Sequence, residues 1–236
     1  MPPDVNRRRL LGASGALLLF SAAPVSLGEE SHEKKDEPET PAAEDLMREH
    51  GVLRRALLIY SEAAARVEAG RPDLPLPALA ATAELFRRFG EDYHERRLEE
   101  EHLFPSLRNG PHGGLVQTLT RQHERGREMT AYIGAVARKG RIVAAHANPF
   151  AQAVRQFVRM YQHHAAIEDT VVFPAWKRAI GKAQYHELTE QFEKLEHQMF
   201  GTDGFEDALR RIAGAEQAFG LSDLDALTAP APPQVT

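Results

Sequence analysis

Apolar residues recur at intervals of three, four and seven along most of the chain, which is the pattern of helices that bury one face. Between residues 40 and 69 this pattern is carried by Leu46, Leu53, Leu57, Ala64 and Val67. Thr40 followed by Pro41 predicts the start of the helix, with the threonine as N-cap and the proline at the first helical position. The sequence RPDLPLP at residues 71–77 predicts its end.

The same pattern predicts further helices. The second runs from about residue 78 to 107, and the turn sequence NGPHGG at 109–114 separates it from a third at 115–139. RIVAAHANP at 141–149 separates the third helix from a fourth at 150–173, which Pro174 kinks or restarts. A fifth segment at 184–200 and an amphipathic helix at 205–219 precede the proline-rich end.

No segment alternates with a period of two, and long helices joined by short connections pack as antiparallel neighbours. The predicted fold is therefore all-α: an antiparallel up-down four-helix bundle at residues 41–180, with a C-terminal helical extension at 181–222 and a disordered tail at 223–236.

The first thirty residues have a different character. Arg7, Arg8 and Arg9 precede a weakly apolar run from about Leu10 to Ala23, which is too short and too rich in small residues for a membrane span. This is the layout of a secretory signal, and the paired arginines resemble a twin-arginine signal. We predict a secretion signal at residues 1–28, a charged linker at 29–40 and export to the periplasm. The alternatives are an uncleaved N-terminal membrane anchor and a disordered basic tail.

The amino-acid composition excludes several classes of functional site. The 236 residues contain no cysteine, which excludes disulfides, thiolate metal sites, iron–sulfur clusters and a cysteine nucleophile. The net charge is -5, and the basic residues are scattered among acids, so no nucleic-acid partner is expected. No phosphate-binding glycine loop, nucleophile elbow or HExxH motif is present, so hydrolases and nucleotide-dependent enzymes have no support.

The candidate chemistry lies in a pattern that occurs twice. YHERRLEEEHLFP at 93–105 and QHHAAIEDTVVFP at 162–174 both read His-x4-Glu-x4-Phe-Pro, which aligns His94 with His163 and Glu99 with Glu168. His164 also lies four residues before Glu168, so these two share a helix face and can reach one metal ion together. His94 and Glu99 are five residues apart, an offset of roughly 140° on an ideal α-helix. They converge only through long side chains or a local π-bulge, which is frequent at functional sites.

Two other predicted helices carry a lone histidine. His50 lies among leucines, and His123 follows Leu119 by four residues, with Gly126 leaving room beside it. Alone, each is more often an ordinary core or surface residue. Together with the duplicated pattern they give every long helix an inward histidine, and two helices a carboxylate, which predicts a two-metal site inside the bundle. Imidazole and carboxylate without thiolate suit non-haem iron best, with manganese or zinc as alternatives.

These residues resemble the hemerythrin-like, or HHE cation-binding, family, whose motif places a lone histidine on helices one and three and His-x3-Glu on helices two and four. The Phe-Pro pairs, REHGVL at 48–53 and LEHQMFGTDGFE at 195–206 also resemble a bacterial branch of that family. The resemblance covers the chain from about residue 44 to 221. It implies a non-haem di-iron centre inside a four-helix bundle, with the ligands His50, His94, Glu99, His123, His164 and Glu168.

The second helix departs from the family motif by one extra residue between His94 and its carboxylate. Glu99 keeps the register of the Phe-Pro pair, and Glu100 is its rival as a ligand. His163 is an additional imidazole, which either orients a ligand or is the true partner of the fourth helix's glutamate. Helix three offers one ligand, so one iron keeps an open position or recruits His197. No metal role is expected for His102, His112, His146 and His186.

An open position on reduced iron, walled by Leu98 and Ile167, would admit a small neutral molecule such as dioxygen or nitric oxide. The expected function is binding or sensing of such a gas, because histidine-rich ligation in proteins of this kind tends to favour reversible binding. One alternative is a di-iron oxidase, peroxidase or nitric oxide reductase. A second alternative is iron storage or a metal that only stabilises the structure.

Overall fold

Helix α1 (Ala42–Glu68) buries the apolar stripe predicted from its sequence. The structure is a computed structural model, and it describes residues 40–71, 74–201 and 203–234. Its N-cap is Pro41, and the hydroxyl of Thr40 accepts a hydrogen bond from the guanidinium of Arg48 at 3.0 Å. The prediction that Thr40 caps the helix was therefore wrong. The predicted secretion signal, and all of the predicted linker before residue 40, lie outside the described residues.

The second predicted helix is a single rod made of three segments. It begins with α2 (Leu76–Leu85), continues as the π-helix η1 (Phe86–Leu103) and ends with α3 (Phe104–Leu107). In a π-helix the backbone N–H bonds the carbonyl five residues back instead of four, so residues five apart share a face.

The third and fourth predicted helices are α4 (Gly113–Arg138) and α5 (Ala144–Ile167). Residues 144–149 were predicted as part of a connector and are instead the start of α5, with Pro149 inside the helix. Pro149 is the sixth residue of α5, beyond the first four N–H groups that have no intrahelical acceptor. The helix therefore continues through Pro149 without the backbone hydrogen bond that another residue would donate there.

A second, shorter π-segment, η2 (Glu168–Val172), joins α5 to α6 (Phe173–Phe200), and α7 (Gly204–Phe219) follows. The break that was expected after the fourth helix lies at Gly181, whose φ of 74° and ψ of 169° interrupt α6. Glycine adopts such a backbone conformation without the penalty that a Cβ atom would bring.

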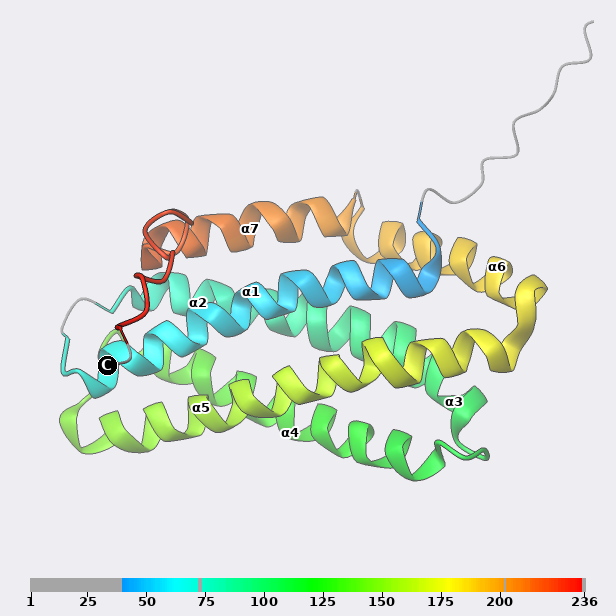
Figure 1. The fold of residues 1–236 in the computed structure, drawn as a ribbon, viewed down its shortest axis with the longest axis horizontal. Coiled ribbons are helices and arrows are strands. Elements are labelled where there is room, and N and C mark those ends of the chain that lie inside the picture. The colour runs from blue at the N-terminus through cyan, green and yellow to red at the C-terminus, as the bar shows by residue number, and fades with distance from the viewer. Residues whose placement is uncertain (1–39, 72–73, 202, 235–236) are drawn as a thin grey trace, which may run out of the picture. The chain divides into compact units, whose positions relative to one another are not determined.

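Figure 1 shows α1 and α4 running in one direction along the bundle, and α2 and α5 in the other. α1 packs against α5, α2 against α4, and α4 against α5, while α7 lies across α1 and α2. All described residues belong to one compact unit. They contain helices and turns without a strand, so the predicted all-α class is confirmed.

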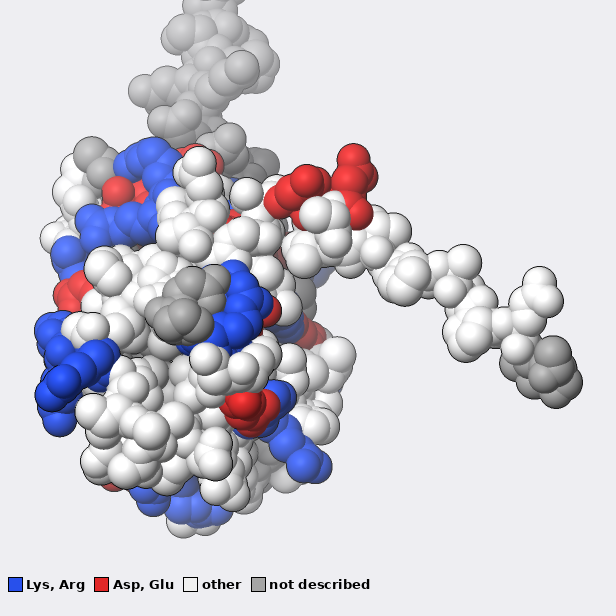
Figure 2. Space-filling view, turned by 90° about the vertical axis from the view of Figure 1, so that its left-hand side faces the viewer, with Lys and Arg blue, Asp and Glu red and all other residues white. Residues whose placement is uncertain are grey.

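The bundle core contains an aromatic cluster on which α1, η1 and α5 meet. The rings of Tyr60, Phe86 and Phe157 lie within 6.1 Å of one another, and each residue is at most 2% exposed. At the bundle end shown in Figure 2, Lys and Arg side chains are interspersed with uncharged and acidic ones. In the described part of the chain no helix is both long enough and apolar enough to cross a membrane.

Candidate metal centre

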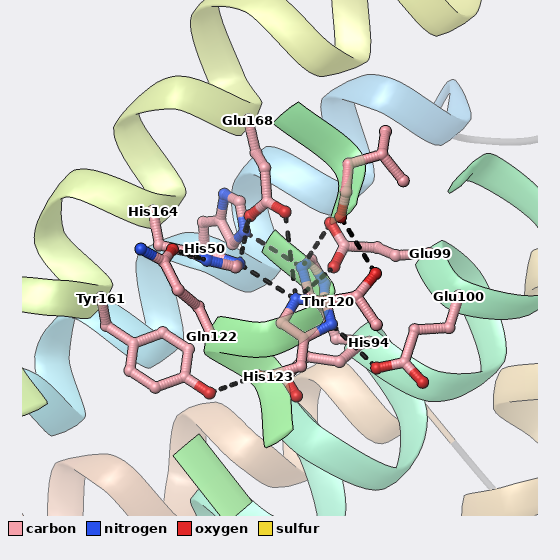
Figure 3. A network of polar contacts seen from close by, with 12 residues as sticks. His50, His94, Glu99, Glu100, Thr120, Gln122, His123, Tyr161, His164 and Glu168 are labelled. Carbon is pink, nitrogen blue, oxygen red and sulfur yellow. Dashed lines mark hydrogen bonds and ion pairs between the residues drawn. The ribbon is translucent and has the colours of Figure 1, made fainter. Parts of the chain in front are cut away.

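Six ionisable side chains converge inside the bundle, where they are almost completely shielded from solvent. Each is at most 3% exposed, and they come from α1, η1, α4, α5 and η2. In Figure 3 four imidazole rings and two carboxylates point toward one another. The six are His50, His94, Glu99, His123, His164 and Glu168.

The centre divides into two histidine pairs. The Nε2 atoms of His50 and His94 lie 3.0 Å apart, and so do the Nε2 atoms of His123 and His164. Two nitrogens that each lie about 2.1 Å from one ion, at a right angle, are separated by about 3.0 Å. Each pair therefore fits two ligand positions on a single cation.

Glu99 lies between the two pairs. Its Oε1 is 3.5 Å from Nε2 of His94, and its Oε2 is 3.3 Å from Nε2 of His123. One carboxylate thus presents one oxygen to each histidine pair.

Glu168 occupies the opposite side of the same space. Its Oε2 lies 3.0 Å from Nε2 of His164 and 3.5 Å from Nε2 of His50, and its Oε1 lies 4.0 Å from Nε2 of His123. Glu168 is therefore also within reach of both pairs.

The residues present fit a pair of cations on chemical grounds. All four carboxylate oxygens of Glu99 and Glu168 are buried and accept no hydrogen bond. Buried, unpartnered carboxylates are costly unless cations offset their charge. Burial acts to raise the pKa of Glu168, but His164 and His50 outweigh it and hold that pKa below its usual range. Burial and Glu168 act to raise the pKa of Glu99, but His94 and His123 outweigh them and lower it. Both carboxylates therefore favour the anionic form, which is the form that binds a metal ion.

The π-helix explains how His94 and Glu99 meet, although two residues five apart would point in different directions on an α-helix. Both residues lie within η1, where positions five apart share a face. The same widening recurs before each Phe-Pro pair: Phe104 donates its N–H to the carbonyl of Glu99, and Phe173 donates to Glu168. A proline ring clashes with the carbonyl four residues back, which disfavours normal α-helical winding just before it.

Both phenylalanines also pack on the centre. The Phe104 ring stacks on His123 at a centroid distance of 5.5 Å, and the Phe173 ring stacks on His50 at 5.4 Å. The Phe-Pro pair therefore has two local roles, since it shapes the turn that carries the glutamate and it covers a histidine.

Each of the four histidines has an acceptor at its other ring nitrogen. The Nδ1 distances are 2.6 Å for His50 to Asp169, 2.5 Å for His94 to Glu49, 2.8 Å for His123 to Glu100 and 2.9 Å for His164 to Gln122. An acceptor at Nδ1 places the ring proton there and leaves Nε2 free to bind a metal ion. All four rings are therefore oriented for ligation through Nε2.

Two arginines complete this outer layer. Arg54 pairs with the carboxylate of Asp169, and Arg127 pairs with that of Glu100. Glu100, the rival of Glu99 in the sequence, thus lies behind His123 and not between the histidine pairs.

A small cavity of about 10 Å³ adjoins the centre, on the scale of a single water molecule. Its apolar wall consists of Leu53, Leu57 and Ala165, and its polar wall includes Tyr161 and Glu95. Leu98 and Ile167, which were expected to wall the site, do not line this cavity, and Ile167 is 38% exposed. The apolar wall of this cavity is thus made by residues other than those two.

Tyr161 reaches the cavity because of a glycine. Its hydroxyl donates to Glu95 at 2.6 Å and lies 1.9 Å from the place where a Cβ atom at Gly126 would stand. The room that Gly126 leaves is thus used by Tyr161, and not by His123 as the sequence suggested.

Two further histidine candidates lie away from the centre. His163 and His197 are both exposed at the surface. The residues that accept hydrogen bonds from the Nδ1 atoms were not predicted from the sequence, although their positions follow a simple rule. Each one directly precedes a lone histidine or directly follows one of the two glutamates of the centre. That signal becomes readable only once the helices are known to face one another.

Fold and site together define a helical bundle with a metal-binding interior. The model of the hemerythrin HHE cation-binding domain matches residues 42–175 and, in an overlapping match, residues 114–228. The chain therefore belongs to the hemerythrin HHE cation-binding domain family, and the resemblance seen in the sequence is confirmed.

Curated relatives extend over nearly the whole chain. Uncharacterized proteins of Mycobacterium bovis and of two Mycobacterium tuberculosis strains are each 39% identical to it over 240 residues. The match covers 96% of this chain and 92% of each relative. No solved structure matches the chain significantly.

Proposed function

We propose that this protein holds two non-haem iron ions between the histidine pairs, and that the centre binds or senses a small gas such as dioxygen or nitric oxide. The observation that carries the proposal is the pair of buried carboxylates, Glu99 and Glu168, whose four oxygens have no hydrogen-bond donor and face four imidazole nitrogens. The proposal includes an antiparallel four-helix arrangement around the centre.

The donor set supports iron. Four imidazoles and two carboxylates, without a thiolate, suit non-haem iron, with manganese or zinc as the competing ions. His50 and His94 would hold one ion, His123 and His164 the other, and the two glutamates would bridge them. Iron(II) with an open coordination position supplies reversible binding of a diatomic gas.

The cavity supports a small, neutral ligand. Leu53, Leu57 and Ala165 give it an apolar wall, and its volume of about 10 Å³ is on the scale of one small molecule. Tyr161 and Glu95 supply the polar wall, where a bound ligand would meet a hydrogen-bonding surface.

We further propose that the protein acts outside the cytoplasm. The support is the sequence alone: Arg7, Arg8 and Arg9 precede a short apolar run, as in a twin-arginine signal. Export of a folded protein through that route would allow the metal to be loaded before the membrane is crossed.

Metal analysis and optical spectra test the proposal. The full chain, purified after expression with iron, is expected to contain two iron ions per chain. Its visible spectrum should change on exposure to dioxygen or nitric oxide and return when the gas is removed. His164→Ala should lose at least one of the two ions, because it removes a ligand nitrogen from one histidine pair.

His112→Ala is the matched control. His112 precedes α4 and lies outside the centre, so this variant should keep the metal content and spectrum of the wild type. Equal metal content in the His164 and His112 variants would contradict the assignment. Turnover of peroxide or nitric oxide would favour an enzyme, and native zinc without a gas response would favour a structural metal.

A further inference from the structure

The two halves of the centre are built from the same parts in the same order. Each lone histidine, His50 or His123, is followed four residues later by an arginine that pairs with the acceptor of that histidine. The acceptors, Asp169 and Glu100, each directly follow a glutamate of the centre.

The acceptors of the other two histidines, His94 and His164, also stand at corresponding positions in the two halves, but they differ in charge. The acceptor of His94 is Glu49, which precedes His50, and the acceptor of His164 is Gln122, which precedes His123. The positions correspond, but a carboxylate stands behind His94 and a neutral amide behind His164. This is the only corresponding acceptor pair that differs in charge.

Glu49 pairs with His94 but, unlike the other two carboxylate acceptors, has no arginine or lysine partner within the described residues. Glu49 is 1% exposed. The groups around it are mostly acids and a phenol: Asp45, Tyr93 and Glu196.

These neighbours respond to the charge of Glu49. Burial, and then Glu49, raises the pKa of Asp45 to about 7, and burial and Glu49 also raise the pKa of Glu196. The carboxylate of Glu49 lies 2.5 Å from Nδ1 of His94, so it acts on the His94 side of the centre. No corresponding charge stands at Gln122, whose amide oxygen lies 2.9 Å from Nδ1 of His164.

A carboxylate that accepts the Nδ1 proton makes an imidazole a stronger ligand than an amide does, because it stabilises the positive charge that develops on the ring. We propose that the two metal positions are unequal, and that the His50–His94 position binds its ion more tightly because Glu49 stands behind His94. This inference rests on the proposed dinuclear centre. It implies an order of loading, with His50–His94 filled first.

The order in which the two positions fill is tested by titrating the metal-free full chain with cobalt(II) and monitoring binding by calorimetry and visible absorption. The wild type is expected to bind two ions in two steps whose dissociation constants differ by at least about tenfold. Glu49→Gln should weaken the tighter step by about 10–100-fold, and Gln122→Glu should tighten the weaker step by a similar factor. Glu124→Gln, an exposed neighbour of Gln122 on α4, is the control and should change neither step.

Single-position variants assign the steps. His164→Ala should keep one ion with the affinity of the tighter step, and His94→Ala should keep one ion with that of the weaker step. The reverse order would overturn the inference, as would two equal steps in the wild type or a Glu49→Gln titration that matches the wild type. If Glu49→Gln does not fold, Gln122→Glu still decides the question from the other half, and an unchanged weaker step then overturns it. Binding of fewer than two ions by the wild type would overturn the dinuclear centre itself.

Discussion

Glu91 is a fully buried carboxylic acid whose two oxygens accept no hydrogen bond. The hydroxyls of its neighbours Thr130 and Tyr60 are likewise buried and without a partner. Arg87 lies 3.8 Å away, too far for a hydrogen bond. Burial is the main reason that the pKa of Glu91 is raised to about 7, from an ordinary value of 4.5. At mildly acidic pH the carboxyl group of Glu91 is therefore protonated and uncharged in the folded protein.

This shift predicts how stability depends on pH. Between the two pKa values the unfolded chain has released the proton of Glu91 while the folded chain keeps it, so the folded state binds more protons and its stability falls as pH rises. Glu91→Gln removes this loss, and above the folded pKa it should raise the free energy of unfolding by on the order of 3 kcal/mol.

Urea unfolding at mildly acidic and mildly alkaline pH measures the effect. The exposed Glu84 on α2 provides the control, since Glu84→Gln should keep the pH dependence of the wild type. The same pH dependence in the Glu91 variant would show that the acid does not hold its proton.

At the scale of the helix, the two π-segments are what make the metal centre possible. η1 aligns His94 with Glu99, and the widened turns before Phe104 and Phe173 carry the two central glutamates. A helix that exchanges i→i−4 bonds for i→i−5 bonds needs a local reason, and the following prolines supply one by crowding the preceding carbonyls.

Pro105→Ala is expected to destabilise the widened helical turn that carries Glu99. Alanine restores a backbone N–H and removes the ring, which allows the turn before it to rewind as an α-helix and to rotate Glu99 away from the histidines. The variant should remain helical by circular dichroism but bind metal at least about tenfold more weakly, the scale on which ligand orientation acts in metal sites.

Pro149→Ala, within α5, is the corresponding control, because no residue of the centre lies in that turn. Full metal affinity in Pro105→Ala would mean that packing, and not the proline, holds the widened turn.

At the scale of the molecule, α7 closes the bundle on the side of α1 and α2. Ile212 and Phe219 are at most 1% exposed, and Arg55 of α1 forms a two-point hydrogen bond with Glu216. The C-terminal extension is thus part of the core. None of its described side chains lies in the centre, and its buried contacts are expected to stabilise the bundle.

Phe219→Ala tests that role. Loss of a buried phenylalanine should lower the free energy of unfolding by about 3–5 kcal/mol. The number of bound ions should not change, because the centre lies in the other helices. Leu224→Ala, at a residue that is 77% exposed, should have little effect. Thermal or urea unfolding with metal analysis distinguishes the two, and a wild-type stability for Phe219→Ala would contradict a structural role of α7.

Helices with a strong apolar period were predictable from the sequence, as α1 and α4 show. Boundaries were less predictable: α5 begins at Ala144 and continues through Pro149, its sixth residue, although proline ordinarily marks the start or the end of a helix. For the site, the repeated His-x4-Glu-x4-Phe-Pro pattern, the lone histidines His50 and His123 and the family resemblance together singled out the six side chains that the structure brings together. The partners behind the histidines were missed, because Glu49 and His94 are 45 residues apart and meet only across two helices.

The sequence by itself determined which side chains could carry the chemistry and that they would lie on helices, since composition and periodicity are properties of the chain. Only the tertiary structure decided which histidine faces which, that the extra residue before Glu99 is absorbed by a π-helix, and that a carboxylate backs one half of the centre and an amide the other. The physical reason is that ligand geometry and electrostatics depend on distances across helices, and the packing of the whole core sets those distances.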